Sequence, residues 1–433
     1  MRICVIGAGY VGLVTAAIFA DMGNQVACLD TDPEKIAALC AGQAPFYEPG
    51  LQEMIERNAD AGRLCFTTDY GQAAPDCEMV FIAVGTPQGP DGGADLSYLE
   101  SAAAHAARNL SDGALIVVKS TVPVGSGDRV RDTIERNLGP GIRFDLASNP
   151  EFLREGSAIA DCLRPDRIVI GCENQGAAMR LVQLYAPLER PMLLMDMKSA
   201  ELVKQASNAF LATRLSFINT IADLCEATGA DVAQVIKGMG ADARIGPHFL
   251  APGIGYGGSC LPKDTGALAA CCEIAGCSAE LMDAVISVNS DRVPRFVGRI
   301  RQTLGGLRGR TIAVLGLAFK PNTDDLRESK AVELVNLLLA EGAQVRVYDP
   351  AAMTKARPLL LGITYCEDAY DAAAGADALA VATDWNEFRM LDLERVRAAL
   401  RQPIIFDGRN LYSPDVMSKL GFRYISVGRP DTP

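Results

Sequence analysis

The stretch from Gly255 to Asp264 places a cysteine between glycines and the expected start of a helix. It reads Gly-Tyr-Gly-Gly-Ser-Cys-Leu-Pro-Lys-Asp, and Pro262 suits the first turn of a helix that continues through 267–272. A helix N-terminus and the adjacent Lys263 both favour the thiolate of Cys260, which is the nucleophilic form. A buried structural cysteine on a glycine turn is the alternative, and it fits most of the other cysteines. The flanking glycines, lysine and aspartate favour a catalytic nucleophile.

A second chemistry-bearing motif opens the chain. Residues 7–12 spell G-x-G-x-x-G between the strand-like run 3–6 and the helical run 13–22. Such glycines permit a tight turn and close approach of a pyrophosphate, which the helix N-terminus then binds. Asp30 ends the next strand, where a carboxylate accepts hydrogen bonds from a ribose 2′-hydroxyl and repels a 2′-phosphate. The motif therefore predicts that the protein binds NAD rather than NADP. The alternative is that residues 7–12 form only a glycine turn of an unrelated α/β sheet. Lys35 is either a solvated helix residue or a neighbour of the adenosine.

Together the two motifs imply a particular reaction. Removal of hydride from an alcohol gives an aldehyde, to which the Cys260 thiolate adds. The resulting thiohemiacetal loses a second hydride and becomes a thioester, and water then releases an acid. This chemistry predicts that two NAD are consumed for each substrate molecule.

Further polar residues stand where such a reaction needs them. Lys204 and Asn208 are one helical turn apart, so both project from one face of a helix, where an ammonium and a carboxamide stabilise an oxyanion. Two polar residues on a solvated face are the alternative. Glu151, Glu155 and Thr121 follow predicted strands, at the end where α/β ligand sites lie.

The elements that position these residues alternate between strand and helix. Strand-like runs at 79–84, 114–118, 144–147, 168–170 and 192–195 predict a doubly wound parallel sheet. No proline occurs between Pro191 and Pro247, and a long helix is expected from an N-cap at Ser199 to about Ala227, before Gly229. We interpret this helix as the spine of a middle domain that joins two halves and pairs subunits.

The opening pattern returns in the last third of the chain. Runs at 311–315 and 345–348 flank a helical run, and the second strand again ends at an acid, Asp349. This imperfect repeat lacks the glycine fingerprint, so it should bind something other than a dinucleotide in the usual way. The sequence thus predicts an α/β protein of two Rossmann-like doubly wound domains joined by a long central helix. The expected domains are an NAD-binding domain (1–196), a central helical dimerisation domain (197–300) and a second Rossmann-like domain (301–433).

Composition excludes several other classes of protein. The 433 residues carry a net charge of -12, which disfavours nucleic acid as a partner. No apolar run approaches the roughly 20 residues of a membrane helix, and no signal peptide precedes residues 2–6. The 13 cysteines form no C-x-x-C pair and only two histidines occur, so we expect reduced cysteines in a cytoplasmic protein without a metal site.

In combination, the motifs resemble the UDP-glucose/GDP-mannose dehydrogenase family over essentially the whole chain. The resemblance rests on the motif 7–12 and on the segments 120–125, 149–156, 201–208, 257–260 and 319–329. It implies NAD-dependent oxidation of a nucleotide-sugar C6 alcohol to the uronic acid in a homodimer, without a metal. The C-terminal domain is then the UDP-sugar-binding domain.

The resemblance also implies residue roles. Cys260 is expected as the nucleophile, and Lys204 and Asn208 as oxyanion stabilisers. Asp264 is expected either to orient a water or to relay protons. Thr121 and Glu155 are expected near the hydrolytic water and the nicotinamide, with Glu155 as a candidate base for thioester hydrolysis. The expected cofactor contacts are Gly7, Gly9, Tyr10, Val11, Gly12, Asp30, Lys35, Thr86, Thr121, Glu155, Lys263 and Arg327. The expected substrate contacts are Glu151, Phe152, Leu153, Arg154, Glu155, Lys204, Asn208, Phe249, Leu250, Ala251, Pro252, Gly253, Gly257 and Lys320, with Arg244 offered across the dimer interface.

Three alternatives remain open from the sequence. UDP-glucose is the favoured substrate, while Leu261 and the Arg327-Glu328-Ser329 segment also occur in relatives that oxidise GDP-mannose or UDP-N-acetyl amino sugars. A two-electron hydroxyacid dehydrogenase leaves the cysteine motif and the second repeat unexplained. The third alternative, a non-catalytic nucleotide-sugar binding protein, is disfavoured by the complete set of catalytic residues.

Overall fold

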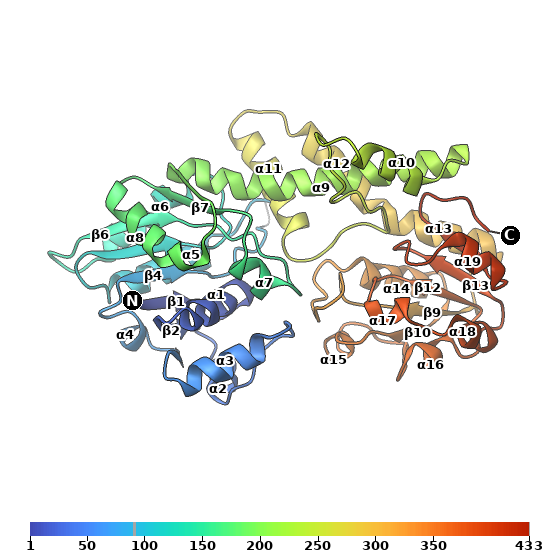
Figure 1. Cartoon of the computed structure of the whole chain (residues 1–433), viewed down its shortest axis with the longest axis horizontal. Coiled ribbons are helices and arrows are strands. Elements are labelled where there is room, and N and C mark those ends of the chain that lie inside the picture. Colours follow the sequence, from blue (N-terminus) through green and yellow to red (C-terminus); the bar gives the residue numbers. More distant parts are fainter. Residues whose placement is uncertain (90–91, 433) are drawn as a thin grey trace. The chain divides into compact units, whose positions relative to one another are not determined.

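The computed structural model describes residues 1–89 and 92–432, which form two compact units. The first unit comprises Met1–Ser207 with Ala270–Cys277, and the second comprises Asn208–Ala269 with Ser278–Pro433. Each contains one sheet, and the long helix α9 (Met197–Thr228) links them in the chain (Figure 1). Two Rossmann-like sheets connected by a long helix confirm the predicted fold class, whereas the three-domain division stays a prediction.

The first sheet has the strand order β3-β2-β1-β4-β5-β6-β7-β8. Its strands are β1 (Arg2–Ile6), β2 (Gln25–Leu29), β3 (Leu64–Thr67), β4 (Met79–Ile82), β5 (Ala114–Val118), β6 (Phe144–Ser148), β7 (Ile168–Cys172) and β8 (Met192–Met195). All neighbours pair in parallel except β6 and β7, which pair antiparallel. The expectation of a parallel sheet is therefore wrong at this one junction, beyond which the strand direction reverses.

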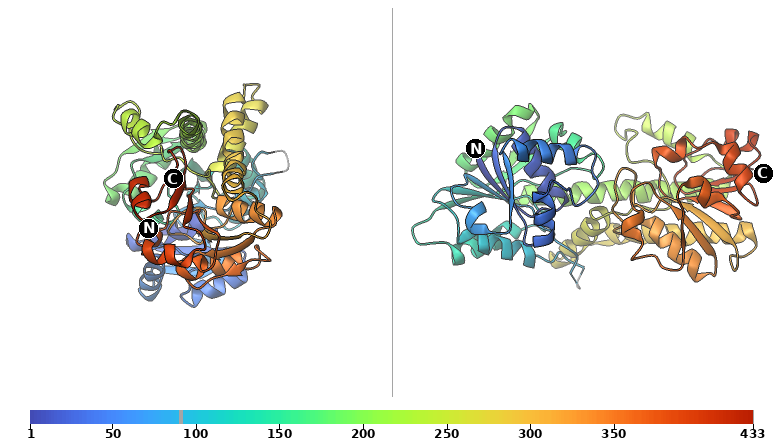
Figure 2. Two further views of the ribbon diagram at one scale, coloured as in Figure 1. Left: turned by 90° about the vertical axis from the view of Figure 1, so that its right-hand side faces the viewer. Right: turned by 90° about the horizontal axis from the view of Figure 1, so that it is seen from below.

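Helices cover both faces of this sheet (Figure 2), and its central strands β1, β4 and β5 are buried except for Arg2 at the start of β1. Alternate residues of β1 belong to two separate hydrophobic clusters. One contains residues of α1 (Tyr10–Asp21) and α8 (Gln175–Tyr185), and the other contains residues of α5 (Ser97–Ala107) and α6 (Ser126–Asn137). The remaining short helices of the unit are α2 (Pro33–Cys40), α3 (Leu51–Asp60), α4 (Tyr70–Ala73), α7 (Ala158–Leu163) and the 3₁₀ turn Ala186–Leu188.

The second sheet is parallel throughout, with the order β11-β10-β9-β12-β13-β14. Its strands are β9 (Thr311–Leu315), β10 (Gln344–Tyr348), β11 (Thr364–Tyr365), β12 (Ala378–Val381), β13 (Ile404–Asp407) and β14 (Arg423–Ser426). The helices after α9 are α10 (Val232–Gly240), α11 (Leu261–Ile274), α12 (Glu280–Ser290), α13 (Arg292–Leu304), α14 (Lys330–Ala340), α15 (Met353–Ala356), α16 (Ala369–Ala373), α17 (Asn386–Arg389), α18 (Leu393–Ala399) and α19 (Pro414–Lys419). The first six strands of each sheet therefore share one order.

The predicted internal repeat extends to individual hydrogen bonds. Gly7 N donates to Leu29 O at 2.6 Å, and Gly316 N donates to Tyr348 O at 2.8 Å. Both glycines have positive φ, +103° and +94°, and a Cβ on either would collide with the neighbouring strand's end. The same strand–turn geometry is thus built twice, and only glycine fits it.

An aspartate follows the second strand of each repeat, Asp30 after β2 and Asp349 after β10. The two aspartates differ in what they bind. Asp30 accepts two backbone hydrogen bonds and a third from Lys35 at 2.9 Å. Asp349 is 1% exposed and accepts four backbone hydrogen bonds and one from the indole of Trp385 at 3.1 Å. Five protein donors saturate Asp349, so it cannot bind a ribose as Asp30 is expected to do.

Helix α9 runs for 32 residues, longer than any other helix in the part of the chain that the structure describes. It begins at Met197, and Asp196 accepts hydrogen bonds from Ser199 N at 2.8 Å and Ser199 Oγ at 2.6 Å. The predicted N-cap at Ser199 is therefore wrong, because the carboxylate of Asp196 takes that role. The helix ends before Gly229, whose φ of +78° stops it as expected.

Even this helix is not apolar enough to cross a membrane, and the same holds for the other helices among the described residues.

We expect Asp349→Ala to lower the free energy of unfolding of the second unit by about 3–5 kcal/mol, because it leaves several buried donors without an acceptor. Trp385 is the single tryptophan and contacts Asp349, so its fluorescence during urea titration reports this transition. Asp30→Ala is the matched control in the other sheet and should leave the Trp385 transition unchanged. An unshifted midpoint for Asp349→Ala would contradict the expectation.

Candidate active site

The three glycines of the motif 7–12 have different surroundings. Two are enclosed by protein atoms, and the third faces open space. A Cβ on Gly7 or Gly12 would collide with backbone atoms, so these two residues hold β1 and α1 together. Gly9 immediately precedes α1, has an ordinary φ of −76° and is exposed, and no protein atom lies within 4 Å of its Cβ position. A helix N-terminus reached over an open glycine fits the pyrophosphate of a dinucleotide.

Asp30, the residue expected to bind the ribose, forms an ion pair with Lys35. Lys35 Nζ lies 2.9 Å from Asp30 Oδ2, and the side chains are 28% and 13% exposed. Helix α2 begins with its own cap, Asp32, which turns Lys35 back toward β2. This contact brings Lys35 to the acid that is expected to bind the adenosine ribose.

The segment after β6 is tied to the glycine motif by two residues. Gly156 N donates to Tyr10 OH at 2.8 Å and to Glu48 Oε2 at 2.6 Å, and Ala158 N donates to Glu48 Oε1 at 2.7 Å. Glu155, which is 8% exposed, is therefore held beside the motif. Glu48 lies in a loop without any recognisable motif, so the sequence alone did not indicate this role.

Glu151 and Lys204 form a buried ion pair. Their charged atoms are 2.9 Å apart, and the side chains are 4% and 3% exposed. Glu151 also accepts a hydrogen bond from Leu153 N at 2.6 Å, and Lys204 Nζ lies 5.4 Å from the centre of the Phe152 ring. Arg154 instead pairs with Asp161 near the surface. The burial of Lys204, and of Asn208 at 7%, excludes a solvated face as the explanation of their spacing.

Side-chain hydrogen bonds join the segments that follow β4 and β5. Thr86 Oγ1 donates to Thr121 O at 2.7 Å, and Ser120 Oγ donates to Val84 O at 2.6 Å. Thr86 and Thr121, both expected cofactor contacts, thus come from adjacent strands to one edge of the sheet.

In the second unit, the cysteine loop packs against the loop that follows β9. Gly258 N donates to Arg327 O at 3.0 Å. Gly258 has a φ of +85°, and a Cβ at this position would collide with the ring of Phe319. A Cβ on Gly257 would collide with Glu328 O. The glycines therefore permit a close approach that brings the cysteine loop to the loop carrying Lys320 and Arg327.

Cys260 lies immediately before α11, and its carbonyl accepts the first hydrogen bond of the helix, from Asp264 N at 2.8 Å. Its Sγ is 3.5 Å from Ser259 Oγ, and the residue is partly exposed. The sulfur thus occupies the positive end of the helix dipole, as the sequence predicts, and this position favours a thiolate.

Asp264 organises the polar groups around the start of α11. It is 1% exposed and accepts hydrogen bonds from Asn208 Nδ2 at 2.6 Å and Lys263 Nζ at 2.5 Å. The bond to Asn208 fixes the orientation of that carboxamide and leaves its second N–H direction for another acceptor. Asp264, Asn208 and Lys263 are thus brought together in one unit.

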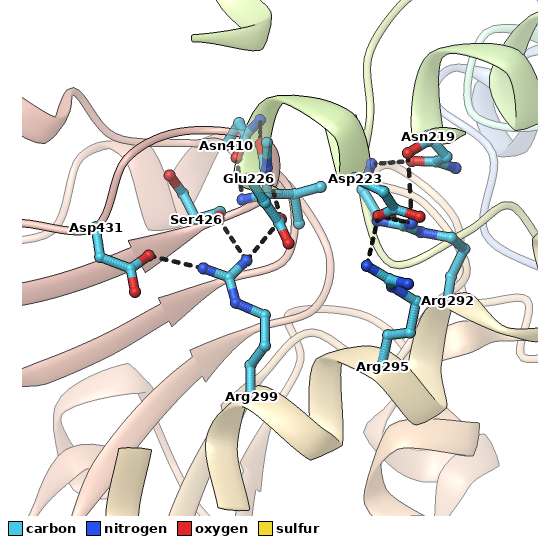
Figure 3. A network of polar contacts seen from close by, with 12 residues as sticks. Asn219, Asp223, Glu226, Arg292, Arg295, Arg299, Asn410, Ser426 and Asp431 are labelled. Carbon is cyan, nitrogen blue, oxygen red and sulfur yellow. Dashed lines mark hydrogen bonds and ion pairs between the residues drawn. The ribbon is translucent and has the colours of Figure 1, made fainter. Parts of the chain in front are cut away.

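The expected substrate loop 249–253 is anchored by residues of α9 and α13. Figure 3 labels three of these residues and their contacts, Asn219, Asp223 and Arg292. Gly253 N donates to Asn219 Oδ1 at 2.8 Å, and Arg292 Nε donates to Gly253 O at 3.2 Å. Arg292 is 5% exposed and is paired with Asp223 of α9. Phe249 has a positive φ of 57°, which indicates backbone strain in this loop.

Two arginines of the second unit are relevant to the expected sites: Arg409 contacts the segment before the cysteine, and Arg244 is an expected substrate contact. Arg409, which is partly exposed, donates to Gly255 O at 2.9 Å, and no sequence motif pointed to it. Arg244 is 88% exposed after α10 and pairs with Asp242. Its expected role toward a partner subunit stays a prediction.

These features define a class of protein: an oxidoreductase that binds a dinucleotide on one Rossmann-like sheet and carries a partly exposed cysteine at a helix N-terminus. Family models match residues 1–189 (NAD binding domain), 198–291 (central domain) and 313–414 (UDP binding domain). All three describe the UDP-glucose/GDP-mannose dehydrogenase family, and the chain belongs to this family.

Full-length relatives agree with this assignment. The UDP-glucose 6-dehydrogenase of Rhizobium meliloti (strain 1021) is 49% identical over 100% of both chains. A UDP-glucose dehydrogenase structure from Pyrobaculum islandicum superposes with a TM-score of 0.92 at 42% identity, covering 99% of this chain and 98% of that chain. A UDP-D-ManNAc dehydrogenase structure from Pyrococcus horikoshii gives a TM-score of 0.88 at 31% identity, over 100% of both chains.

We expect Gly9→Ala to fold with unchanged stability and to raise the KM for NAD by about tenfold or more, since its methyl group occupies the space that the pyrophosphate needs. Gly12→Ala is the matched contrast and should be destabilised, because its Cβ would overlap Gly7 O. Thermal melting separates the two variants, and NAD titration measures the binding. A Gly9→Ala enzyme with normal KM for NAD would place the pyrophosphate elsewhere.

Proposed function

We propose that this protein oxidises UDP-glucose to UDP-glucuronate in a four-electron reaction that uses two NAD. The observation that carries the proposal is Cys260 at the N-terminus of α11, beside the hydrogen-bonded pair Asn208 and Asp264. A two-electron dehydrogenase has no use for such a cysteine. The identity to relatives named for UDP-glucose, 49% and 42%, exceeds the 31% to the relative named for UDP-D-ManNAc and favours the glucose substrate.

In the first oxidation, the C6 hydroxyl passes its proton to water by way of Asp264, and C6 loses a hydride, which leaves an aldehyde. Bound NAD supplies the hydride acceptor in this step and in the second oxidation. The buried Lys204 ammonium and the Asn208 N–H attract the oxygen as negative charge develops on it. The motif 7–12, Asp30 and Lys35 would hold the dinucleotide, and Thr86, Thr121 and Glu155 are the further residues that would contact it.

The second half of the reaction takes place on the cysteine. The Cys260 thiolate forms an S–C bond to the aldehyde carbon, whose oxygen becomes the oxyanion of a thiohemiacetal. Loss of the second hydride gives the thioester. Water then attacks the carbonyl carbon, the C–S bond breaks and the thiolate returns, while Glu155 accepts a proton from the water and Asp264 relays protons near Cys260.

We expect wild-type enzyme to form two NADH for each UDP-glucose when the sugar is limiting and NAD is in excess. Cys260→Ser should lower overall turnover by at least about 10³-fold, since it removes the nucleophile of the second oxidation. Absorbance of NADH together with separation of the nucleotide sugars provides both measurements. A ratio of one with wild-type enzyme would contradict the four-electron reaction, and turnover only with GDP-mannose or a UDP-N-acetyl amino sugar would reassign the substrate.

We also propose that the protein is a homodimer that pairs through α9. This helix exposes four large apolar side chains at intervals of eight, seven and seven residues: Leu202 (44%), Phe210 (62%), Phe217 (49%) and Leu224 (58%). Side chains at such spacing form one stripe along a helix, and a stripe of this kind suits burial against a second helix. Across this interface, Arg244 would reach the partner's substrate.

Phe210→Asp combined with Phe217→Asp is expected to convert a dimer to a monomer, because each carboxylate would be buried at the interface. Sedimentation velocity measures the change in mass. Tyr98→Asp on α5 changes a residue that is 60% exposed and serves as the control that stays dimeric. A dimer that survives the double substitution would exclude this face of α9.

A further inference from the structure

A pocket of about 450 Å³ lies at the edge of the second sheet where its strands begin. The loop between α13 and β9 lines it, together with one residue before β12 and one before β13: Gly305, Gly306, Arg308, Gly309, Arg310, Asp377 and Arg401. These strands are parallel, so their carboxyl ends lie at the opposite edge of the sheet, where the loop after β9 carries Lys320 and Arg327. The pocket is therefore separate from the expected substrate contacts of that loop.

Positive charge predominates among the residues that line this pocket. Its charged members are three arginines, Arg308, Arg310 and Arg401, and one aspartate, Asp377, although the whole chain carries a net charge of -12. Guanidinium groups match phosphate oxygens with pairs of parallel hydrogen bonds. A phosphate group with two negative charges would balance the excess of positive charge in the lining.

Asp377 holds two of these arginines in place. Its carboxylate, which is 7% exposed, lies 3.6 Å from Arg310 Nη1 and 3.3 Å from Arg401 Nη1. It also accepts a hydrogen bond from Thr311 N at 2.8 Å, which fixes it to the first residue of β9. Each guanidinium has five N–H donors, so these contacts leave donors on both arginines, whose side chains are 39% and 59% exposed.

Arg308, the third arginine, has different surroundings. It is exposed, and no carboxylate within residues 1–89 and 92–432 forms an ion pair with it. The three glycines of the segment 305–309 have positive φ, and no atom beyond their adjacent residues lies within 4 Å of their Cβ positions. The space beside this loop is therefore open to a ligand.

We propose that this pocket is a phosphate-binding site that takes the di- or triphosphate chain of a small molecule. The inference goes beyond the proposed function and does not rest on it. The volume lies in the range of small-molecule sites and exceeds that of a single phosphate group. Among the described residues that line the pocket there is no aromatic side chain, so the site would recognise the phosphate chain and not a nucleobase.

Isothermal titration calorimetry of the full chain with tripolyphosphate tests the proposal. Saturating NADH and UDP-glucose, which cannot react with each other, are present so that the expected dinucleotide and nucleotide-sugar sites are already occupied. We expect one site per chain with a Kd below about 1 mM, weakened by added salt because salt screens the ionic contacts. ATP, GTP and CTP should bind with affinities within about threefold of one another, because no aromatic ring stacks on the base.

Arg308→Gln combined with Arg401→Gln should weaken the binding of tripolyphosphate by about 10- to 100-fold, since each substitution removes a charge-assisted contact. Arg357→Gln combined with Arg395→Gln is the matched control. It removes the same charge from exposed positions of the same unit that do not line the pocket, and it should keep the affinity within about twofold. Should the first double variant not fold, Arg308→Glu alone tests the site, because the contacts of Asp377 stay intact.

The outcomes separate this inference from the proposed function. Equal affinity in wild-type protein and in Arg308→Gln/Arg401→Gln, or no binding below about 1 mM, would overturn the site. Equal weakening in the control pair would also overturn it, because tripolyphosphate would then respond to net charge alone. A strong preference for one nucleobase would overturn recognition through the phosphate chain. If wild-type enzyme does not oxidise UDP-glucose, the proposed function fails, whereas the comparison of variants still decides whether the pocket binds phosphate.

Discussion

The parallel pairing of strands is the constraint on which the candidate site depends. Parallel strands bring their carboxyl ends to one edge, and in the first unit the ends of β1, β4, β5 and β6 supply Gly9, Thr86, Thr121 and Glu151. The hydrogen bonds from Thr86 to Thr121 and from Lys119 to Asn149 then fix those ends to one another. Residues that are far apart in the chain become neighbours because the sheet gives them one common edge.

Buried charge is the second organising feature, and it is distributed differently in the two units. Glu151 and Lys204 pair in the first, while Asp264 binds Asn208 and Lys263 in the second. Removal of one partner from such a set leaves an uncompensated buried charge, so these groups hold their positions firmly. That rigidity suits a reaction in which negative charge develops on a substrate oxygen, because fixed dipoles and charges need no reorganisation.

The internal repeat illustrates how one backbone geometry serves two purposes. Gly7 and Gly316 make the same turn with the same hydrogen bond, yet Asp30 keeps part of its surface exposed beside Lys35, whereas Asp349 is saturated by five protein donors. In the second unit, the loop after β9 packs against the cysteine loop instead of opening to a dinucleotide. A few side-chain contacts therefore decide what each copy can bind.

The sequence by itself determined the two Rossmann-like units, the long helix, the glycine motif and the cysteine at a helix N-terminus, because each follows from local spacing of glycine, apolar and charged residues. Only the tertiary structure decided the pairing of Lys204 with Glu151, the hydrogen bond from Lys119 to Asn149 and the anchoring roles of Glu48, Arg292 and Arg409. Those partners are separated by tens or hundreds of residues, and no local periodicity encodes them. The antiparallel entry of β7 and the cap at Asp196 were missed for a related reason: strand direction and capping depend on which competing hydrogen-bond partner the folded chain places nearest.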